Sequence, residues 1–279
     1  MTRLLCRSGF TSVAFVVVAA GSVEGVTRNI LITGFWPPTN EMLRPWSTNA
    51  AQNPTGWIGE DWEGRGYNVH SYFPEFPGGV TVNPRGVGDF EVDYQDTSND
   101  WWRITDELDP VAIITFSRGH DDRSWELESR NIKWERQGWF PDYLLPLRPT
   151  ADLPIFDEPD NTIRDSSLPM NAIRGAVNAA GLGVNSYIDT GDEFGGNFVS
   201  NFIGYHGLWY HDLHSDPSDP RWNIAAGHIH VGIQTSTEQG RAATELTLRE
   251  LTTYLDTVIP EPGSLALLLF AGVALPRRR

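Results

Sequence analysis

Two segments in the second half of the chain carry five of its seven histidines, which are the residues best suited to proton transfer or metal binding near neutral pH. The segment GNFVSNFIGYHGLWYHDLH at 196–214 holds three histidines and a neighbouring aspartate: His206, His211, His214 and Asp212. The segment AAGHIHVG at 225–232 holds His228 and His230. These two are two residues apart on an expected strand, so their side chains point to the same face.

A histidine–carboxylate cluster of this size could ligate zinc if its members converge in space. The H-x4-H-x2-H spacing of 206–214 matches no strong zinc motif. A helix face with several aromatic residues and histidines is also more commonly a packing surface. We therefore expect no metal and no other cofactor, and we keep a zinc-dependent hydrolase as the third alternative.

A serine nucleophile is the second chemistry that these segments offer. Ser200 stands at the start of an expected helix, where free backbone N–H groups can stabilise an oxyanion. A serine needs a base to take its proton, and His230 on the next strand is the candidate. A carboxylate from Glu126 or Glu128 could orient that imidazole. A serine at a helix start is also commonly only an N-cap.

The elements that must position these residues alternate between strands and helices. Continuous or alternating apolar runs predict strands at 29–33, 67–73, 111–116, 125–134, 184–188 and 229–233. Helical spacing predicts helices at 99–108, 168–180, 198–213 and 235–255. Residues 138–166 read as an irregular surface excursion, and 190–196 as a glycine-bearing loop. This order predicts one α/β domain with a twisted, mostly parallel sheet and helices on both faces.

Composition excludes several classes of protein. The 279 residues are 40% hydrophobic and include a single cysteine, Cys6, and no apolar run reaches the roughly 20 residues of a membrane-spanning helix, so a multi-pass membrane protein is excluded. The formal net charge of −15 repels phosphate backbones and anionic lipid surfaces. We therefore expect no nucleic-acid partner, and contact with a membrane only through the C-terminal tail described below.

Residues 1–25 have the three-part pattern of a secretory signal peptide, with Arg3 and Arg7 before an apolar run at 13–20 and then small residues. Its removal would also remove Cys6, which leaves residues 26–258, the predicted α/β domain, without any thiol. Disulfides, thiolate zinc sites and a cysteine nucleophile are then excluded.

Residues 259–279 combine the triplet Pro260-Glu261-Pro262, a short apolar stretch and three terminal arginines. This tail resembles the PEP-CTERM sorting signal of exported bacterial envelope proteins. The resemblance implies partners in the secretion machinery and an exosortase. It also implies a location outside the cell or in the bacterial cell envelope.

Four motifs follow one another in the same order as in a known peptidase family: NILITGFWPP at 29–38, SSLPMNAI at 166–173, GNFVSNF at 196–202 and GHIHVG at 227–232. Together they resemble the pyroglutamyl peptidase I (pyrrolidone-carboxylate peptidase) family over roughly the whole central domain. The resemblance implies a compact α/β fold and removal of an N-terminal pyroglutamyl residue by a Glu-Cys-His triad.

The family's site residues fall on positions of this chain. Its histidine falls on His230 and its nucleophile on Ser200. Its glutamate falls on Glu128 if the strand alternation is matched, and on Glu126 if the spacing to Asn131 is matched; we prefer Glu128. The acyl-side pocket is implied to be lined by three residues: Phe35, Phe198 and Val199.

Two departures from the family stand out. Trp36-Pro37-Pro38 replaces the usual acidic residue, proline and second aromatic of the substrate loop, and serine replaces the catalytic cysteine. We therefore expect an exported hydrolase that acts on N-terminal pyroglutamyl or related amide bonds of a peptide or small amide, with a Ser-His-Glu triad. The alternative is a catalytically inactive surface module that keeps the fold as a binding or interaction domain.

Overall fold

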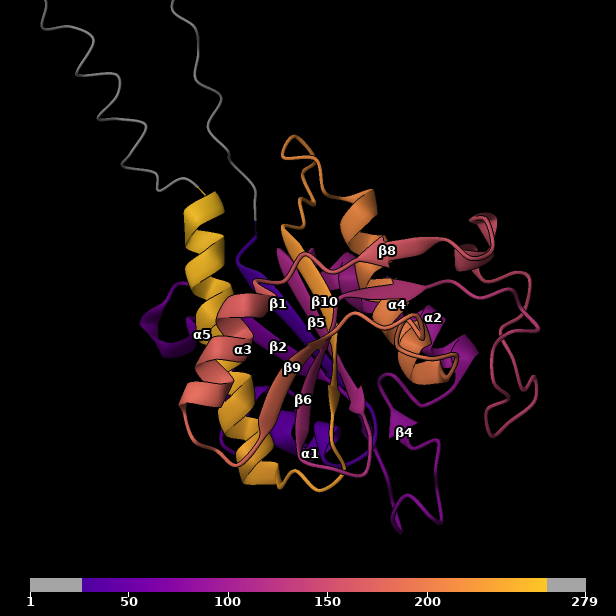
Figure 1. The fold of residues 1–279 in the computed structure, drawn as a ribbon, viewed down its shortest axis with the longest axis horizontal. Coiled ribbons are helices and arrows are strands. Elements are labelled where there is room, and N and C mark those ends of the chain that lie inside the picture. The colour runs from indigo at the N-terminus through magenta and orange to yellow at the C-terminus, as the bar shows by residue number, and fades with distance from the viewer. Residues whose placement is uncertain (1–26, 260–279) are drawn as a thin grey trace, which may run out of the picture.

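A six-stranded sheet runs through the middle of the protein in the computed structural model, which describes residues 27–259 (Figure 1). The strand order is β2-β1-β5-β10-β6-β9. The strands are β1 (Asn29–Gly34), β2 (Asn68–Tyr72), β5 (Ala112–Arg118), β6 (Ser124–Glu128), β9 (Asn185–Asp189) and β10 (Ala225–Val231). Strands β2, β1, β5 and β10 are parallel, whereas β6 is antiparallel to β10 and parallel to β9.

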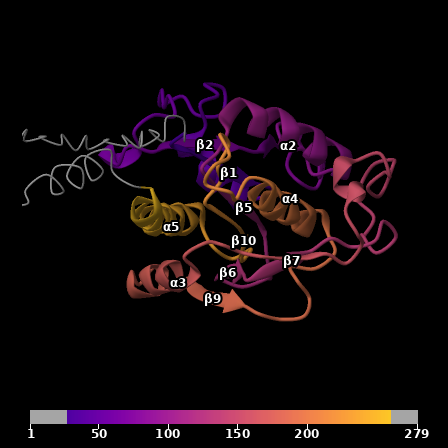
Figure 2. The same ribbon diagram turned by 90° about the horizontal axis from the view of Figure 1, so that it is seen from above.

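Helices cover both faces of this sheet (Figure 2). One face carries α1 (Thr39–Leu43), α3 (Met170–Ala179) and α5 (Thr237–Val258), and the other carries α2 (Tyr94–Leu108) and α4 (Val199–Leu213). Apolar residues pack in two clusters, one on each side of the sheet. The central strand β5 lies between them, and its apolar residues are buried, as expected for a strand with both faces covered. The predicted α/β fold class is confirmed.

Short elements complete the fold. They are η1 (Arg44–Trp46), η2 (Trp62–Gly64), β3 (Pro74–Glu75), β4 (Val87–Gly88), β7 (Arg130–Ile132), η3 (Pro154–Asp157) and β8 (Ile163–Asp165). Strand β7 pairs with β8 outside the main sheet. The predicted strand 125–134 is therefore two strands, because the chain leaves the main sheet after Glu128 and pairs with β8 instead.

Helix α2 begins five residues before the predicted start at Asn99. Its N-cap is Asp93, whose carboxylate accepts hydrogen bonds from the backbone N–H groups of Gln95 and Asp96. Helix α5 is held at its start by a capping box, in which Ser236 and Gln239 each satisfy a backbone donor of the other. Both helices therefore begin where a side chain satisfies the first free N–H groups.

The two ends of the described chain lie at the same edge of the sheet (Figure 1). Arg28, just before β1, forms an ion pair with Asp256 near the end of α5 (3.8 Å). The hydroxyl of Tyr67 also donates to Asp256 (2.8 Å). Within residues 27–259, no helix is long and apolar enough to cross a membrane. The predicted signal peptide at 1–25 and the triplet-bearing tail after Ile259 lie outside the described residues.

Candidate active site

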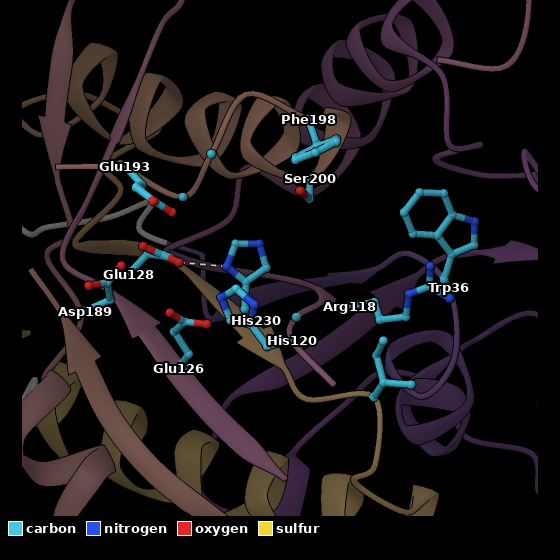
Figure 3. Close-up of a pocket in the computed structure, with 14 residues that line it drawn as sticks. Trp36, Arg118, His120, Glu126, Glu128, Asp189, Glu193, Phe198, Ser200 and His230 are labelled. Carbon is cyan, nitrogen blue, oxygen red and sulfur yellow. Dashed lines mark hydrogen bonds and ion pairs between the residues drawn. The ribbon is translucent and has the colours of Figure 1, made fainter. Parts of the chain in front are cut away.

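A pocket of about 320 Å³ opens between the ends of β5 and β10 and the start of α4 (Figure 3). Its walls bring together residues from distant parts of the chain: Trp36, Arg118, Gly119, His120, Glu126, Glu128, Asp189, Glu193, Gly195, Gly196, Phe198, Ser200, His230 and Ile233. The carboxyl ends of parallel strands meet at one edge of a sheet, which is the usual place for a site in α/β folds.

His230 and Glu128 form the central contact of this pocket. Nδ1 of His230 donates a hydrogen bond to Oε1 of Glu128 (2.7 Å), and both side chains are largely buried. Because a carboxylate only accepts, this bond places a proton on Nδ1 and leaves the lone pair of Nε2 free. The imidazole is therefore oriented as a general base would be.

Glu126 lies beside this pair, because it is directly opposite His230 in the ladder between β6 and β10. Only 5% of its surface is exposed. Burial raises the pKa of Glu126, while the nearby His230 lowers it and the negative charge of Glu128 raises it further. No hydrogen bond joins Glu126 to His230 in the described chain, which leaves Glu128 as the carboxylate that contacts the imidazole.

Ser200 occupies the second position of α4 and faces the same pocket (Figure 3). The N-cap residue is Phe198, whose side chain cannot accept a hydrogen bond, so the first backbone N–H groups of α4 have no side-chain cap. Among residues 27–259, neither Ser200 Oγ nor His230 Nε2 has a hydrogen-bond partner. Both atoms are therefore available to a ligand in the pocket.

Two buried asparagines hold the start of α4 in place through hydrogen bonds. Asn201 donates to the carbonyl of Ile132 (2.9 Å) and accepts from the amide of Asn131. Gly195, with φ of +76°, packs against both amides, and a Cβ there would lie 2.7 Å from Asn131 Nδ2. Only glycine suits this close, left-handed position. The loop before α4 is therefore held in the conformation that points Ser200 into the pocket.

His228 supports the neighbouring imidazole from inside the sheet. It is fully buried, with Nδ1 bonded to Thr115 Oγ1 (2.8 Å) and Nε2 bonded to Ser117 Oγ (2.9 Å). Burial lowers its pKa well below the usual value, so this ring stays neutral. It meets the ring of His230 edge to face, with centroids 4.6 Å apart. We assign it a packing role, since both its nitrogens are already used.

A second pocket of about 250 Å³ adjoins the first and is mostly aromatic. It is lined by Trp36, Tyr94, Arg118, Phe140, Pro141, Asp142, Tyr143, Phe198 and Val199. Trp36, Arg118 and Phe198 line both pockets. Burial and the charge of Asp93 raise the pKa of Asp142 to about 6.

The position of Phe35 corrects one expectation. Phe198 and Val199 line the second pocket, but Phe35 is fully buried and lines neither pocket. Its side chain packs in the core cluster on the α2 and α4 side of the sheet. The next residue, Trp36, is directed into the pockets instead.

The histidines of α4 do not assemble into a metal site with those of β10. His206 is fully buried and bonded to Ser98 (3.2 Å), and burial lowers its pKa to about 4. His211 bonds Asn223, and His214 bonds Asp219. Asp212 forms an ion pair with Arg164. Within the described residues, the set that could hold a metal is Glu126, Glu128 and His230, whose ligand atoms lie within 4.8 Å of one another.

Sequence reasoning did not find several residues that shape the site. The segment 138–166, expected as a surface excursion, supplies Phe140 and Tyr143 to the second pocket. Arg118, at the end of β5, lines both pockets, and its guanidinium lies 5.0 Å from the centre of the Trp36 ring. Asp189 and Glu193 add to the acidic side of the first pocket. The position of Arg118 after a buried strand was the one signal that could have marked it.

Comparisons with known proteins bear on the fold. No family profile matches the sequence, and no curated protein matches it either. Among solved structures, a mutant pyrrolidone carboxyl peptidase from the hyperthermophile Pyrococcus furiosus is similar with a TM-score of 0.57 and 16% identity, over 81% of this chain and 99% of that chain. The pyrrolidone carboxyl peptidase from Thermococcus litoralis is similar with a TM-score of 0.55 and 18% identity, over 84% of this chain and 99% of that chain. The chain therefore has the fold of the pyrrolidone carboxyl peptidases.

Proposed function

We propose that the protein is a hydrolase that cleaves the amide bond after an N-terminal pyroglutamyl or related acyl group, with Ser200, His230 and Glu128 as its triad. The observation that carries this proposal is the hydrogen bond between His230 Nδ1 and Glu128, in a pocket that also contains Ser200 at the start of α4. The likeness in fold to the pyrrolidone carboxyl peptidases supports it.

In this mechanism Ser200 Oγ attacks the carbonyl carbon of the acyl group while its proton moves to His230 Nε2. The oxyanion that forms accepts hydrogen bonds from the free N–H groups at the start of α4. The C–N bond then breaks, and Nε2 returns the proton to the leaving amine. Water attacks the acyl-serine with His230 as base, which releases the carboxylic acid and restores Ser200.

A serine nucleophile depends more strongly on the general base His230 than a cysteine nucleophile would. A thiol is partly ionised near neutral pH and is a strong nucleophile, whereas a hydroxyl needs its proton removed during attack. The bond from His230 to Glu128 supplies that help, because the carboxylate stabilises the imidazolium that forms. The acyl group would lie against Trp36, Phe198 and Val199.

The test is hydrolysis of pyroglutamyl-aminomethylcoumarin by the purified protein, combined with labelling by a fluorophosphonate probe. We expect release of coumarin and a single label on the peptide that contains Ser200. No turnover and no label would favour the binding module instead. Loss of activity on chelation, with stoichiometric zinc in the protein, would favour a zinc hydrolase built on Glu126, Glu128 and His230.

We also propose that the protein is exported and sorted to the bacterial cell envelope through its two end segments. The support is the signal-peptide pattern at 1–25 and the tail at 259–279, which resembles a substrate of an exosortase. Mass spectrometry of the protein recovered from producing cells is expected to find an N-terminus near residue 26. A cytoplasmic protein that retains Met1 would contradict export.

A further inference from the structure

The first pocket is divided by charge. Glu126, Glu128, Asp189 and Glu193 lie together on one side of His230, and Arg118 lies on the other side beside Trp36 (Figure 3). Figure 3 shows the guanidinium turned toward the indole and away from the acidic residues. An anionic group of a ligand would be repelled on the first side and attracted on the second.

Arg118 has no carboxylate partner within residues 27–259. Its contact is the face of the Trp36 ring, 5.0 Å from the guanidinium carbon, and no ion pair or hydrogen bond of its side chain is formed there. Several other partly buried arginines of the fold are ion-paired, such as Arg44 with Glu75 (2.6 Å), whereas Arg130 and Arg148, which lie outside both pockets, also have no carboxylate partner in the described chain. Asp142 shares the second pocket with Arg118 but forms no ion pair with it. A half-buried guanidinium gains most from a planar anion that accepts two of its hydrogen bonds.

The position of Arg118 also indicates which part of a substrate its guanidinium would contact. It lines the second pocket together with Phe198 and Val199, the residues next to Ser200. In the proposed function the acyl group lies against the walls of this pocket, so a group bound there belongs to the acyl side of the substrate. The leaving amine must then lie toward the acidic side, where a carboxylate is disfavoured.

Building on the proposed function, we propose that Arg118 selects an acyl group that carries its own carboxylate, so that the preferred substrates are amides of dicarboxylic acyl groups rather than of neutral ones. The carboxylate would form a charge-assisted pair with the guanidinium while the acyl chain packs against Trp36 and Phe198. The neutral lactam of a pyroglutamyl group leaves Arg118 without this partner.

Two coumarin amides that differ only in charge test this proposal: the glutaryl amide and its 4-carbamoylbutanoyl counterpart. We expect kcat/KM to favour the glutaryl amide by about tenfold or more, the size of one charge-assisted hydrogen bond. Arg118→Gln is expected to abolish this preference and Arg118→Lys to keep part of it. The matched control is Arg123→Gln, which removes the same charge from an exposed position and should keep the full preference.

Equal kcat/KM for the two amides, or an unchanged preference in Arg118→Gln, would overturn the proposal even if Ser200-dependent hydrolysis is found. If the protein cleaves no amide, the proposed function fails, but calorimetry on the same protein still decides the inference. Glutarate should then bind more tightly than glutaramate, and only when Arg118 is present. Inorganic phosphate that binds as tightly as glutarate would also contradict it, since the site would then be a general anion site.

Discussion

Replacing Ser200 by alanine is expected to lower kcat/KM for a pyroglutamyl amide by at least about 10³-fold, because removal of a serine nucleophile leaves only binding and oxyanion stabilisation. The His230–Glu128 bond does not involve Ser200 Oγ, and Ser200 Oγ has no hydrogen-bond partner in the described chain, so the fold and the base should survive the change. Steady-state kinetics on both proteins measure the effect. An alanine variant with unchanged activity would exclude Ser200 as the nucleophile.

The variant Ser200→Cys is the matched partner of that experiment. A thiol at the start of α4 would lie in the positive field of the helix and near His230, both of which favour the thiolate. We expect turnover within about tenfold of the wild type, together with inactivation by iodoacetamide. In a Cys6→Ser background this thiol is the single one in the chain. Insensitivity of the active variant to iodoacetamide would show that position 200 is not at the reacting centre.

The second large effect is expected at Glu128. Glutamine there can donate its amide hydrogen to His230 Nδ1, which moves the ring proton to Nε2 and removes the lone pair that must accept from Ser200. A wrong tautomer of this kind costs about 10⁴-fold in a serine-protease triad, so we expect a loss of about 10³- to 10⁴-fold in kcat. The change keeps the shape of the side chain, and kinetics near neutral pH measure it.

Glu126→Gln is the matched control on the same strand. Glu126 faces His230 across the ladder but forms no hydrogen bond with it in the described chain, so the expected loss is under about tenfold. A larger loss for Glu126→Gln than for Glu128→Gln would reverse the assignment of the two carboxylates. It would also support the alternative comparison with the peptidase family, in which the spacing to Asn131 places the triad glutamate on Glu126.

The fold was predictable where burial dominates the pattern. The run at 111–116 is apolar except for Thr115 because β5 is covered on both faces. Residues 125–128 alternate because β6 holds Trp125 and Leu127 on one side and its glutamates on the other. The predicted start of α2 was wrong because the first turn is polar and depends on the cap at Asp93. The end of β6 was missed because the residues beyond it are still buried, but against α4 rather than within the main sheet.

The site was predictable only where residues share a strand or a motif. The alternation of β6 and the pair of histidines on β10 indicate which side chains share a face, and the structure joins Glu128 to His230. Hydrophobic periodicity does not predict the conformation of a loop that follows a strand. The sequence therefore could not show that Trp36, and not Phe35, lines the pocket. Whether an arginine such as Arg118 has an acidic partner depends on contacts far apart in sequence, and no local pattern reports it.

The ion pair between Arg28 and Asp256 brings the two described ends of the chain close together. Both described ends lie where β1, β5 and β10 begin, whereas the pocket lies where those strands finish (Figure 1). A strand of six residues spans about 20 Å, so Ser200 lies roughly that far from either described end. In a molecule attached through either end, the pocket would therefore open on the side of the domain that faces away from the point of attachment.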